Sequence, residues 1–204
     1  MENYTYLELL EKLDGRTPSY LELLKTAEWR SYREAVLKRD NQKCRKCETK
    51  ASMKGSTAHY RDHTPDELSQ LKLLNQVEHQ LREPDIILDD GTYIKFKNAI
   101  PIAERLEKPL YLHVHHHYYI FQHLPWEYEI DDLETLCAKC HEEFHQKHTV
   151  PYYMDSSKQE KLSLTPCSRC HGAGHLSQYS YHHGGICFHC HGAKYEELIG
   201  LGHY

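Results

Sequence analysis

The stretch LHVHHHYYIFQHLPWEYEIDDLETLCAKCHEEFH, residues 112–145, contains a histidine run followed by a cysteine pair and two further histidines. A helix that includes 141–147 would place His141 and His145 one turn apart on the same face. Two imidazoles at this spacing can share one metal ion. The helix therefore predicts half of a metal site, which needs further ligands from elsewhere.

The histidine run at the start of this stretch lies on an expected β-strand and supplies the candidate partners. Strand alternation places His113, His115 and His117 on one face and His116 on the other. Neighbouring histidines with divided roles suit a hydrolytic metal site, because one can bind the ion while the other takes a proton from water. His113 and His117 are expected to be supporting groups and not ligands.

Cysteines add a second kind of site. All eight form C-x2-C pairs, namely Cys44/Cys47, Cys137/Cys140, Cys167/Cys170 and Cys187/Cys190. The opening residues, MENYTYLELLEKL, are acidic and amphipathic and do not have the pattern of a signal peptide. Disulfides are the alternative, but paired C-x2-C motifs favour zinc in a reducing compartment. We therefore expect two structural zinc ions in a cytoplasmic protein.

The first zinc site is expected to join two distant pairs, with the ligands Cys44, Cys47, Cys137 and Cys140. Loop-closure entropy grows only slowly with loop length, so a bound metal can offset it. This zinc would fix the end of an N-terminal helix to the start of the histidine helix.

The second zinc site is expected in an internal repeat, CSRCHGAG at 167–174 and CFHCHGAK at 187–194. The spacing C-x2-C-x16-C-x2-C is typical of a four-thiolate ribbon with the ligands Cys167, Cys170, Cys187 and Cys190. The repeat resembles half of the DnaJ-type chaperone zinc domain, although Lys194 stands where that pattern has a glycine. The neighbouring histidines are expected to be bystanders or supporting groups, namely His171, His189 and His191.

The composition and charge of the chain restrict how it could contact nucleic acid or a membrane. A chain of 204 residues with 39% hydrophobic residues and a net charge of -5 does not coat nucleic acid by bulk electrostatics. Local contact with a phosphate backbone is expected from a basic helical segment that contains Arg30, Arg33, Lys38 and Arg39, although a solvated helix face is an equal alternative. No apolar run approaches the roughly 20 residues that cross a bilayer, so no membrane contact is expected.

The organisation along the chain indicates an α+β protein. We expect helices over 4–13 and 18–39 within an N-terminal part, 1–40, and a polar insert over about 48–109. The insert should contain a helix that starts after Thr64 and a hairpin around Asp90-Gly91. The remaining parts are a strand, loop and helix core over 110–148, a linker over 149–163 and the zinc ribbon over 164–204, with the first domain covering 1–148.

Two blocks of the chain, EWRSYREAVLKRDNQKCRKC and the stretch at 112–145, resemble HNH endonucleases of the ββα-metal fold in the subgroup with a four-cysteine zinc. The resemblance implies that His115, His141 and His145 bind a catalytic divalent metal. It implies that His116 is the general base. The insert departs from compact members of the family, in which the two blocks lie close together.

The resemblance implies hydrolysis of a phosphodiester with a single Mg²⁺, Mn²⁺, Ni²⁺ or Zn²⁺ ion, in addition to two structural Zn²⁺. The expected partner is DNA, double- or single-stranded, and the ribbon would bind DNA or a protein. One such site cuts one strand at a time, so a double-strand break would need a homodimer or two events. The alternative is a non-catalytic zinc-stapled adaptor that binds nucleic acid or a protein.

Overall fold

A computed structural model describes residues 4–54, 59–81, 86–87, 93–94, 103–106, 109–179, 182 and 185–201. The protein has mixed helices and strands with small sheets, as the α+β prediction expects. The chain divides into two compact units, one of residues 1–46 and 111–204 and one of residues 47–110. The second unit covers the expected insert. The boundaries expected at 148 and 164 stay predictions, and the residues on both sides of them belong to the first unit.

Three N-terminal helices begin the first unit: α1 (Tyr6–Leu13), α2 (Tyr20–Leu23) and α3 (Ala27–Arg39). The sequence predicts one helix over 18–39, and this is wrong, because Thr26 starts a new helix by accepting a hydrogen bond from the backbone of Trp29. The helix α2 starts with a capping box between Ser19 and Glu22.

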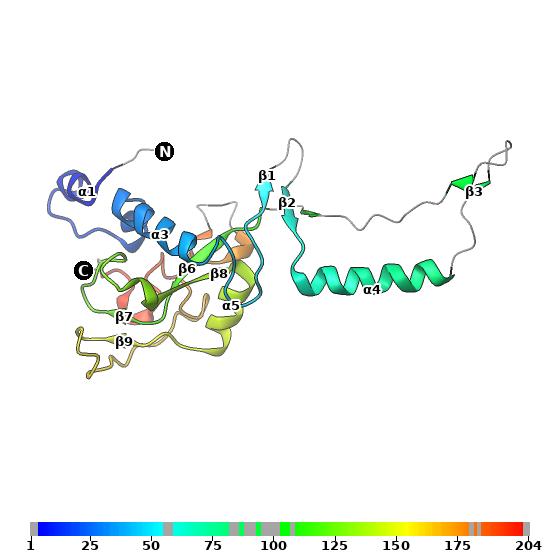
Figure 1. Ribbon diagram of the computed structural model, residues 1–204. Helices are drawn as coiled ribbons and strands as arrows, with labels where there is room; N and C mark the ends of the chain where they lie inside the picture. The colour runs from blue at the N-terminus through cyan, green and yellow to red at the C-terminus, as the bar shows by residue number, and fades with distance from the viewer. Residues whose placement is uncertain are drawn as a thin grey trace. The chain divides into compact units, whose positions relative to one another are not determined.

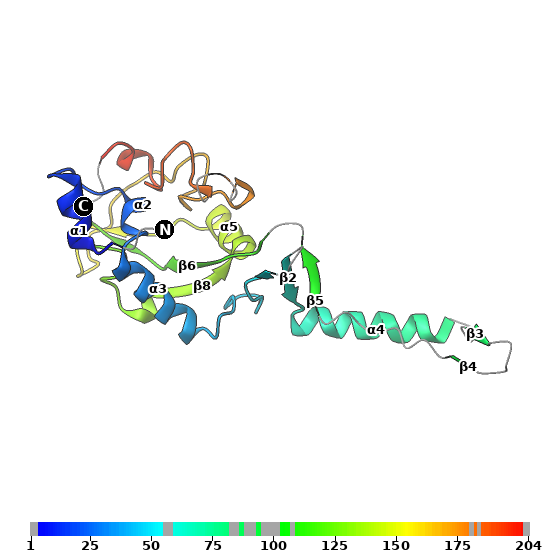
Figure 2. The ribbon, with the colours of Figure 1, turned by 90° about the horizontal axis from the view of Figure 1, so that it is seen from above.

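The centre of the first unit is an antiparallel strand pair, β6 (Leu112–His116) and β8 (Leu133–Cys137). The short 3-10 helix η1 (Ile130–Asp132) precedes β8, and α5 (Ala138–Lys147) follows it directly. Figure 2 shows α3 on one side of the strand pair and α5 on the other. The expected histidine helix is therefore present, and it lies against the strand that carries the histidine run.

Apolar side chains between α3 and the strand pair form the first core cluster. It contains Trp29, Val36, Ile120, Tyr128 and Leu133. Burial of such side chains contributes about 1.5–3 kcal/mol each, which fixes α3 to the strands.

The segment expected to be a linker, 149–163, makes regular backbone contacts. Its strand β9 (Tyr152–Tyr153) pairs in parallel with β7 (Tyr119–Ile120). The buried Val150 packs with Tyr152 and with Tyr195 of the ribbon, and the Tyr195 hydroxyl donates a hydrogen bond to the Val150 carbonyl. These contacts fix the later part of the ribbon, at Tyr195, to the segment 149–163.

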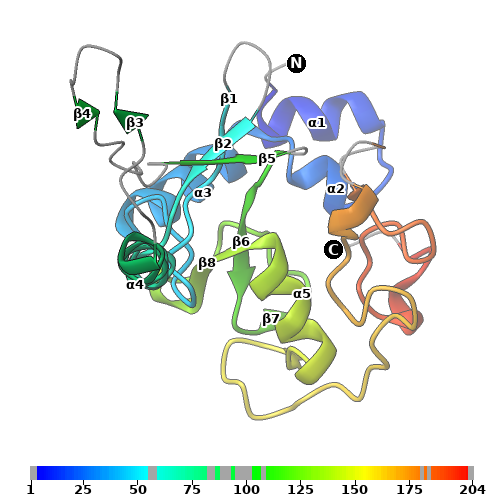
Figure 3. The ribbon, with the colours of Figure 1, turned by 90° about the vertical axis from the view of Figure 1, so that its right-hand side faces the viewer.

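The ribbon ends the first unit and includes the 3-10 helices η2 (Ser177–Tyr179) and η4 (Glu196–Leu198). Figures 2 and 3 show it, in orange to red, on the α5 side of the strand pair. The Ser177 hydroxyl donates a hydrogen bond to Glu142 of α5 over 2.9 Å. The two repeats hold each other through backbone hydrogen bonds from Cys167 to Lys194 and from Cys187 to Gly174.

The second unit contains a three-stranded sheet in the order β1-β2-β5, with the strands Met53–Lys54, His59–Asp62 and Ala103–Leu106. The helix α4 (Pro65–Leu81) follows β2 (Figure 1). It begins after Thr64, as predicted, and Thr64 and Glu67 form a capping box. The strands β3 (Ile86–Ile87) and β4 (Tyr93–Ile94) pair as an antiparallel hairpin. The predicted turn, Asp90-Gly91, lies outside the described residues.

Candidate metal centres

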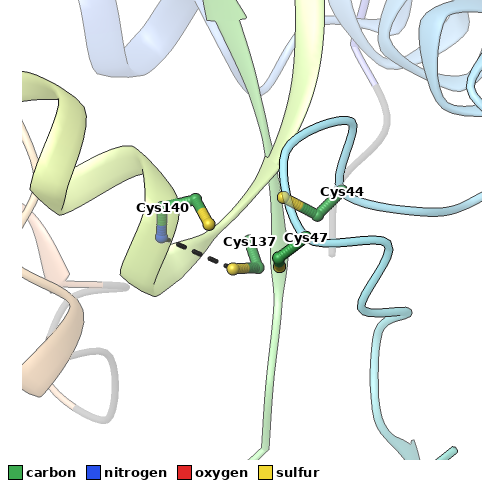
Figure 4. Close-up of side chains that lie close together, drawn as sticks. All are labelled: Cys44, Cys47, Cys137 and Cys140. Atoms are coloured by element: carbon green, nitrogen blue, oxygen red, sulfur yellow. Dashed lines mark hydrogen bonds between the residues drawn. The ribbon is translucent and has the colours of Figure 1, made fainter. Parts of the chain in front are cut away.

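Four cysteines from the two distant pairs come together where α3 ends and α5 begins. The ligand atoms of Cys44, Cys47, Cys137 and Cys140 all lie within 4.8 Å of one another. Figure 4 shows the four side chains converging, with the backbone N–H of Cys140 donating to the sulfur of Cys137. Four thiolates at this separation suit a tetrahedral structural zinc ion.

Hydrogen bonds to β8 place the first cysteine pair. The backbone N–H of Arg45 donates to the carbonyl of Thr135 over 2.8 Å, and the backbone N–H of Thr135 donates to the Asp40 carboxylate over 2.9 Å. Arg39 beside Asp40 helps to hold the pKa of that carboxyl below its usual value, against the opposing and larger effect of burial. The chain after α3 is therefore fixed to the strand that leads to the second cysteine pair.

The ribbon cysteines form a second four-thiol cluster, with the members Cys167, Cys170, Cys187 and Cys190, all buried. Two sulfur pairs across the repeats are 3.8 and 3.7 Å apart. A tetrahedral zinc ion with Zn–S bonds of about 2.3 Å requires sulfur separations of about 3.8 Å. The residues present therefore fit zinc.

The two ribbon repeats also match in backbone conformation. Both glycines that follow the cysteine pairs, Gly172 and Gly192, have φ near +90°, a conformation that glycine adopts without strain. Of the three histidines expected to be bystanders or supporting groups, His189 pairs with Glu196 over 2.8 Å. His189 and Glu196 also lie close to Cys167, but that sulfur belongs to the four-thiol cluster, so we regard them as supporting groups.

Three imidazoles form the third cluster, between β6 and α5. The ligand nitrogens of His115, His141 and His145 all lie within 4.8 Å of one another, and the three residues are buried. Neither ring nitrogen of His115 has a hydrogen-bond partner among the described residues, and neither does Nδ1 of His145. Unpaired buried polar atoms are costly, and a divalent metal ion would satisfy one ring nitrogen of each imidazole. This donor set fits the expected catalytic metal.

Burial keeps these imidazoles neutral, which is the form that binds metal. It lowers the pKa of His115 to about 2 and that of His145 to about 4. It also lowers the pKa of His141 well below its usual value, with a further effect from His113.

The histidines around the cluster occupy different environments. His113 stacks on His141 with ring centroids 5.1 Å apart, and it contacts His175 of the ribbon at 4.8 Å. His117 is exposed, and its Nε2 lies 3.7 Å from Glu134. His113 is thus a packing neighbour of the cluster, as expected of a supporting group.

His116 faces the opposite side of β6, which agrees with the predicted alternation. Its ring stacks on Trp29 of α3 at 5.7 Å and contacts Tyr128 at 4.8 Å, and only 1% of its surface is exposed. Its Nε2 lies 2.9 Å from the carbonyl oxygen of Pro125. A carbonyl only accepts, so Nε2 carries the proton and Nδ1 has the lone pair. Burial lowers the pKa of His116 to about 3.

Two of the four basic residues expected to contact nucleic acid make structural hydrogen bonds. Arg33 donates to the carbonyl of Leu112 over 2.8 Å, and Arg39 donates to the carbonyl of Leu133 over 2.7 Å. Both side chains fasten α3 to the strand pair. Lys38 is exposed, and Arg30 is partly buried.

The sequence reasoning missed Lys194, which occupies the position of Gly174 in the other repeat. Its φ of +71° is in the left-handed region, and its side chain is buried with the amine 3.2 Å from the ring centroid of Tyr20 and 4.1 Å from that of Tyr119. Burial lowers the pKa of this amine well below its usual value. The only signal in the sequence was its departure from the glycine of the repeat.

No protein-family model matches the chain, and comparison with curated proteins and with solved structures also finds no match. Among the helices that the structure describes, none has the length and apolar character to span a membrane.

Proposed function

We propose that the protein is a metal-dependent endonuclease of the HNH type, which hydrolyses phosphodiester bonds of nucleic acid. The observation that carries the proposal is the buried cluster of His115, His141 and His145, with ring nitrogens that lack partners, on an antiparallel strand pair followed by a helix. The four-cysteine cluster at the start of that helix supports it, because it would brace the elements that hold the imidazoles.

The three imidazoles would hold one divalent ion, which would supply charge neutralisation at the scissile phosphate and at the leaving oxygen. An imidazole donor set suits Zn²⁺, Ni²⁺, Mn²⁺ or Co²⁺ better than Mg²⁺. Two Zn²⁺ ions in the cysteine clusters would be structural.

His116 is the proposed general base. The Pro125 carbonyl holds the proton on Nε2, so Nδ1 would accept the proton of the attacking water. A buried imidazole with a pKa of about 3 is a weak base, but an anionic phosphate nearby would raise the pKa towards the working pH. The pH below which activity is lost would then reflect the pKa of His116 in the substrate complex, and not its pKa in the free protein.

Cleavage assays test the proposal. The zinc-loaded protein is incubated with supercoiled DNA, single-stranded DNA and RNA, each with Mn²⁺, Ni²⁺, Mg²⁺ or Zn²⁺. We expect at least one substrate to be cut, and the variant His116→Gln to be inactive with unchanged zinc content. Full cleavage by this variant would refute the role of His116, and the absence of metal-dependent cleavage of any substrate would refute the nuclease.

The second candidate is a zinc-stapled adaptor for nucleic acid or a protein, whose ribbon would bind the partner. The net charge of -5 and the burial of His116 favour it. An adaptor needs the two cysteine clusters but no exchangeable ion at the imidazoles. A chain that holds two zinc ions and takes up no third metal would support the adaptor over the nuclease.

A further inference from the structure

A cavity of about 440 Å³ lies beside the histidine cluster, between α3, β6 and the ribbon. His141 belongs to the histidine cluster and also lines this cavity. The volume falls in the range of small-ligand pockets, about 300–1,000 Å³. The cavity is therefore large enough for one nucleotide beside the proposed hydrolytic site.

The chemistry of the cavity wall is unusual for this chain. Two basic side chains, Arg33 and Lys194, line it together with three imidazoles. The chain has 30 acidic residues, yet no Asp or Glu is among the described residues of the lining. Arginine binds phosphate oxygens through its planar fork, lysine binds them as a point charge, and imidazole N–H groups donate to them. This wall suits an anion.

The position of Lys194 supports the same conclusion. The left-handed backbone at this position favours glycine, which the other repeat has, and a lysine there is strained. Its buried amine contacts the faces of two tyrosine rings, and no described carboxylate pairs with it, although Cys190 and Cys170 attract its charged form. Burial favours the neutral amine, and a phosphate in the cavity would favour the charged amine and accept its hydrogen bonds.

An aromatic ring is available for a base. Tyr111 lines the cavity, and 52% of its surface is exposed. Bases of single strands stack on exposed aromatic side chains, and this stacking contributes about 1–3 kcal/mol per base. A duplex keeps its bases stacked inside a stiff rod, so it cannot present a single nucleotide to a cavity of this size without unpairing.

We propose that this cavity binds one nucleotide of a single-stranded nucleic acid, with its phosphate at Arg33 and Lys194 and its base on Tyr111. The inference rests on the proposed function, because it names single strands as the substrate class of the same site. The ribbon then selects the substrate, since it contributes Lys194 and one wall of the cavity.

Binding is measured by fluorescence anisotropy on the full chain that holds only the two structural zinc ions, without added divalent metal, so that no cleavage occurs. The probes are a short 5'-phosphorylated single strand and the matching duplex, with dAMP and inorganic phosphate as competitors. We expect the single strand to bind at least about tenfold more tightly than the duplex, and dAMP to compete better than phosphate. Equal affinity for the duplex, or competition by phosphate as strong as by dAMP, would overturn the proposal.

Variants identify the contacts. Lys194→Met keeps an unbranched side chain and removes the amine, and Tyr111→Ala removes the stacking ring; each should weaken single-strand binding about tenfold. The control Lys161→Met makes the same change at an exposed lysine and should leave binding unchanged. If Lys194→Met does not fold, the Tyr111 variant and the competition data decide.

The two proposals fail in different ways. Single-strand binding that depends on Lys194 and Tyr111, without cleavage under any metal, would refute the nuclease and retain the cavity. Cleavage of single strands that is unaffected by both substitutions would refute the cavity and retain the nuclease.

Discussion

The Nε2 atom of His116 donates a hydrogen bond to the carbonyl oxygen of Pro125 over 2.9 Å, and this contact is buried. It fixes the tautomer and the ring orientation of the proposed base. The same contact makes His116 part of the core, because its ring also packs on Trp29. Catalysis and stability are therefore linked at this residue, and substitutions must be chosen to separate them.

The variants His116→Gln and His116→Ala make that separation. The glutamine amide can still donate to Pro125 but cannot serve as a base, so we expect cleavage to fall about 10²–10⁴-fold with little loss of stability. Alanine leaves a cavity and an unpaired carbonyl, and we expect a further loss of about 2 kcal/mol or more in the free energy of unfolding. Urea unfolding beside the cleavage assay checks both, and equal stability of the two variants would contradict the buried contact.

Acid should destabilise the metal-free histidine site. Burial lowers the pKa of His113 to about 3, whereas an unfolded histidine titrates near 6.5. Between these values the unfolded chain binds more protons, so stability is full above about pH 6.5 and falls as the pH decreases towards 3. Each such histidine contributes a slope of up to about 1.4 kcal/mol per pH unit.

The variant His113→Phe tests this linkage, because phenylalanine preserves the stacking but does not titrate. Between pH 6.5 and 5 its free energy of unfolding should fall less steeply than that of the wild type, by up to about 1.4 kcal/mol per pH unit. Urea unfolding at several pH values measures the slopes. Identical slopes would show that His113 is not kept neutral by burial.

Loss of the ribbon zinc should weaken the histidine site. The ribbon contacts α5 through Ser177 and Glu142, and a Cβ added at Gly172 would lie 3.7 Å from Nδ1 of His145. Supporting contacts of this kind affect metal affinity by about 10–100-fold. We expect Cys187→Ser to lose one zinc ion and to bind the third metal at least about tenfold more weakly. Unchanged affinity in calorimetry would make the ribbon independent of the site.

Two neighbouring basic residues should give opposite results. Arg39 donates to the carbonyl of Leu133, so Arg39→Met should cost about 1–3 kcal/mol of stability. Lys38 is exposed, and Lys38→Met should reduce nucleic-acid affinity and its salt dependence without changing stability. Anisotropy at two salt concentrations and urea unfolding compare the variants. An Arg39→Met variant that keeps its stability but binds nucleic acid weakly would show instead that Arg39 contacts a phosphate.

Local patterns in the sequence predicted which cysteines and histidines the fold brings together. The C-x2-C pairs and the four-residue spacing of His141 and His145 depend on turns and one helix, and the structure brings both four-cysteine sets and the three histidines together. Strand alternation also predicted that His115 and His116 lie on opposite faces of β6. The break before α3 was missed, because Thr26 starts that helix without a capping box.

Contacts between distant segments were not predictable in this way. Nothing local to Lys194 indicates that its amine reaches Tyr20, and nothing local to Arg33 indicates a bond to the carbonyl of Leu112. These contacts depend on how the ribbon and α3 pack on the strand pair, which a single sequence does not encode in any short pattern. The cavity formed by them was missed for the same reason.

The central claim is that three imidazoles form a metal site distinct from two structural zinc sites. Metal content by mass spectrometry, followed by calorimetric titration with Mn²⁺ or Ni²⁺, tests it most directly. The account predicts two tightly held zinc ions and one exchangeable ion per chain, with the exchangeable ion lost in His145→Gln while both zinc ions remain. Two zinc ions with no third binding event in the wild-type protein would contradict it.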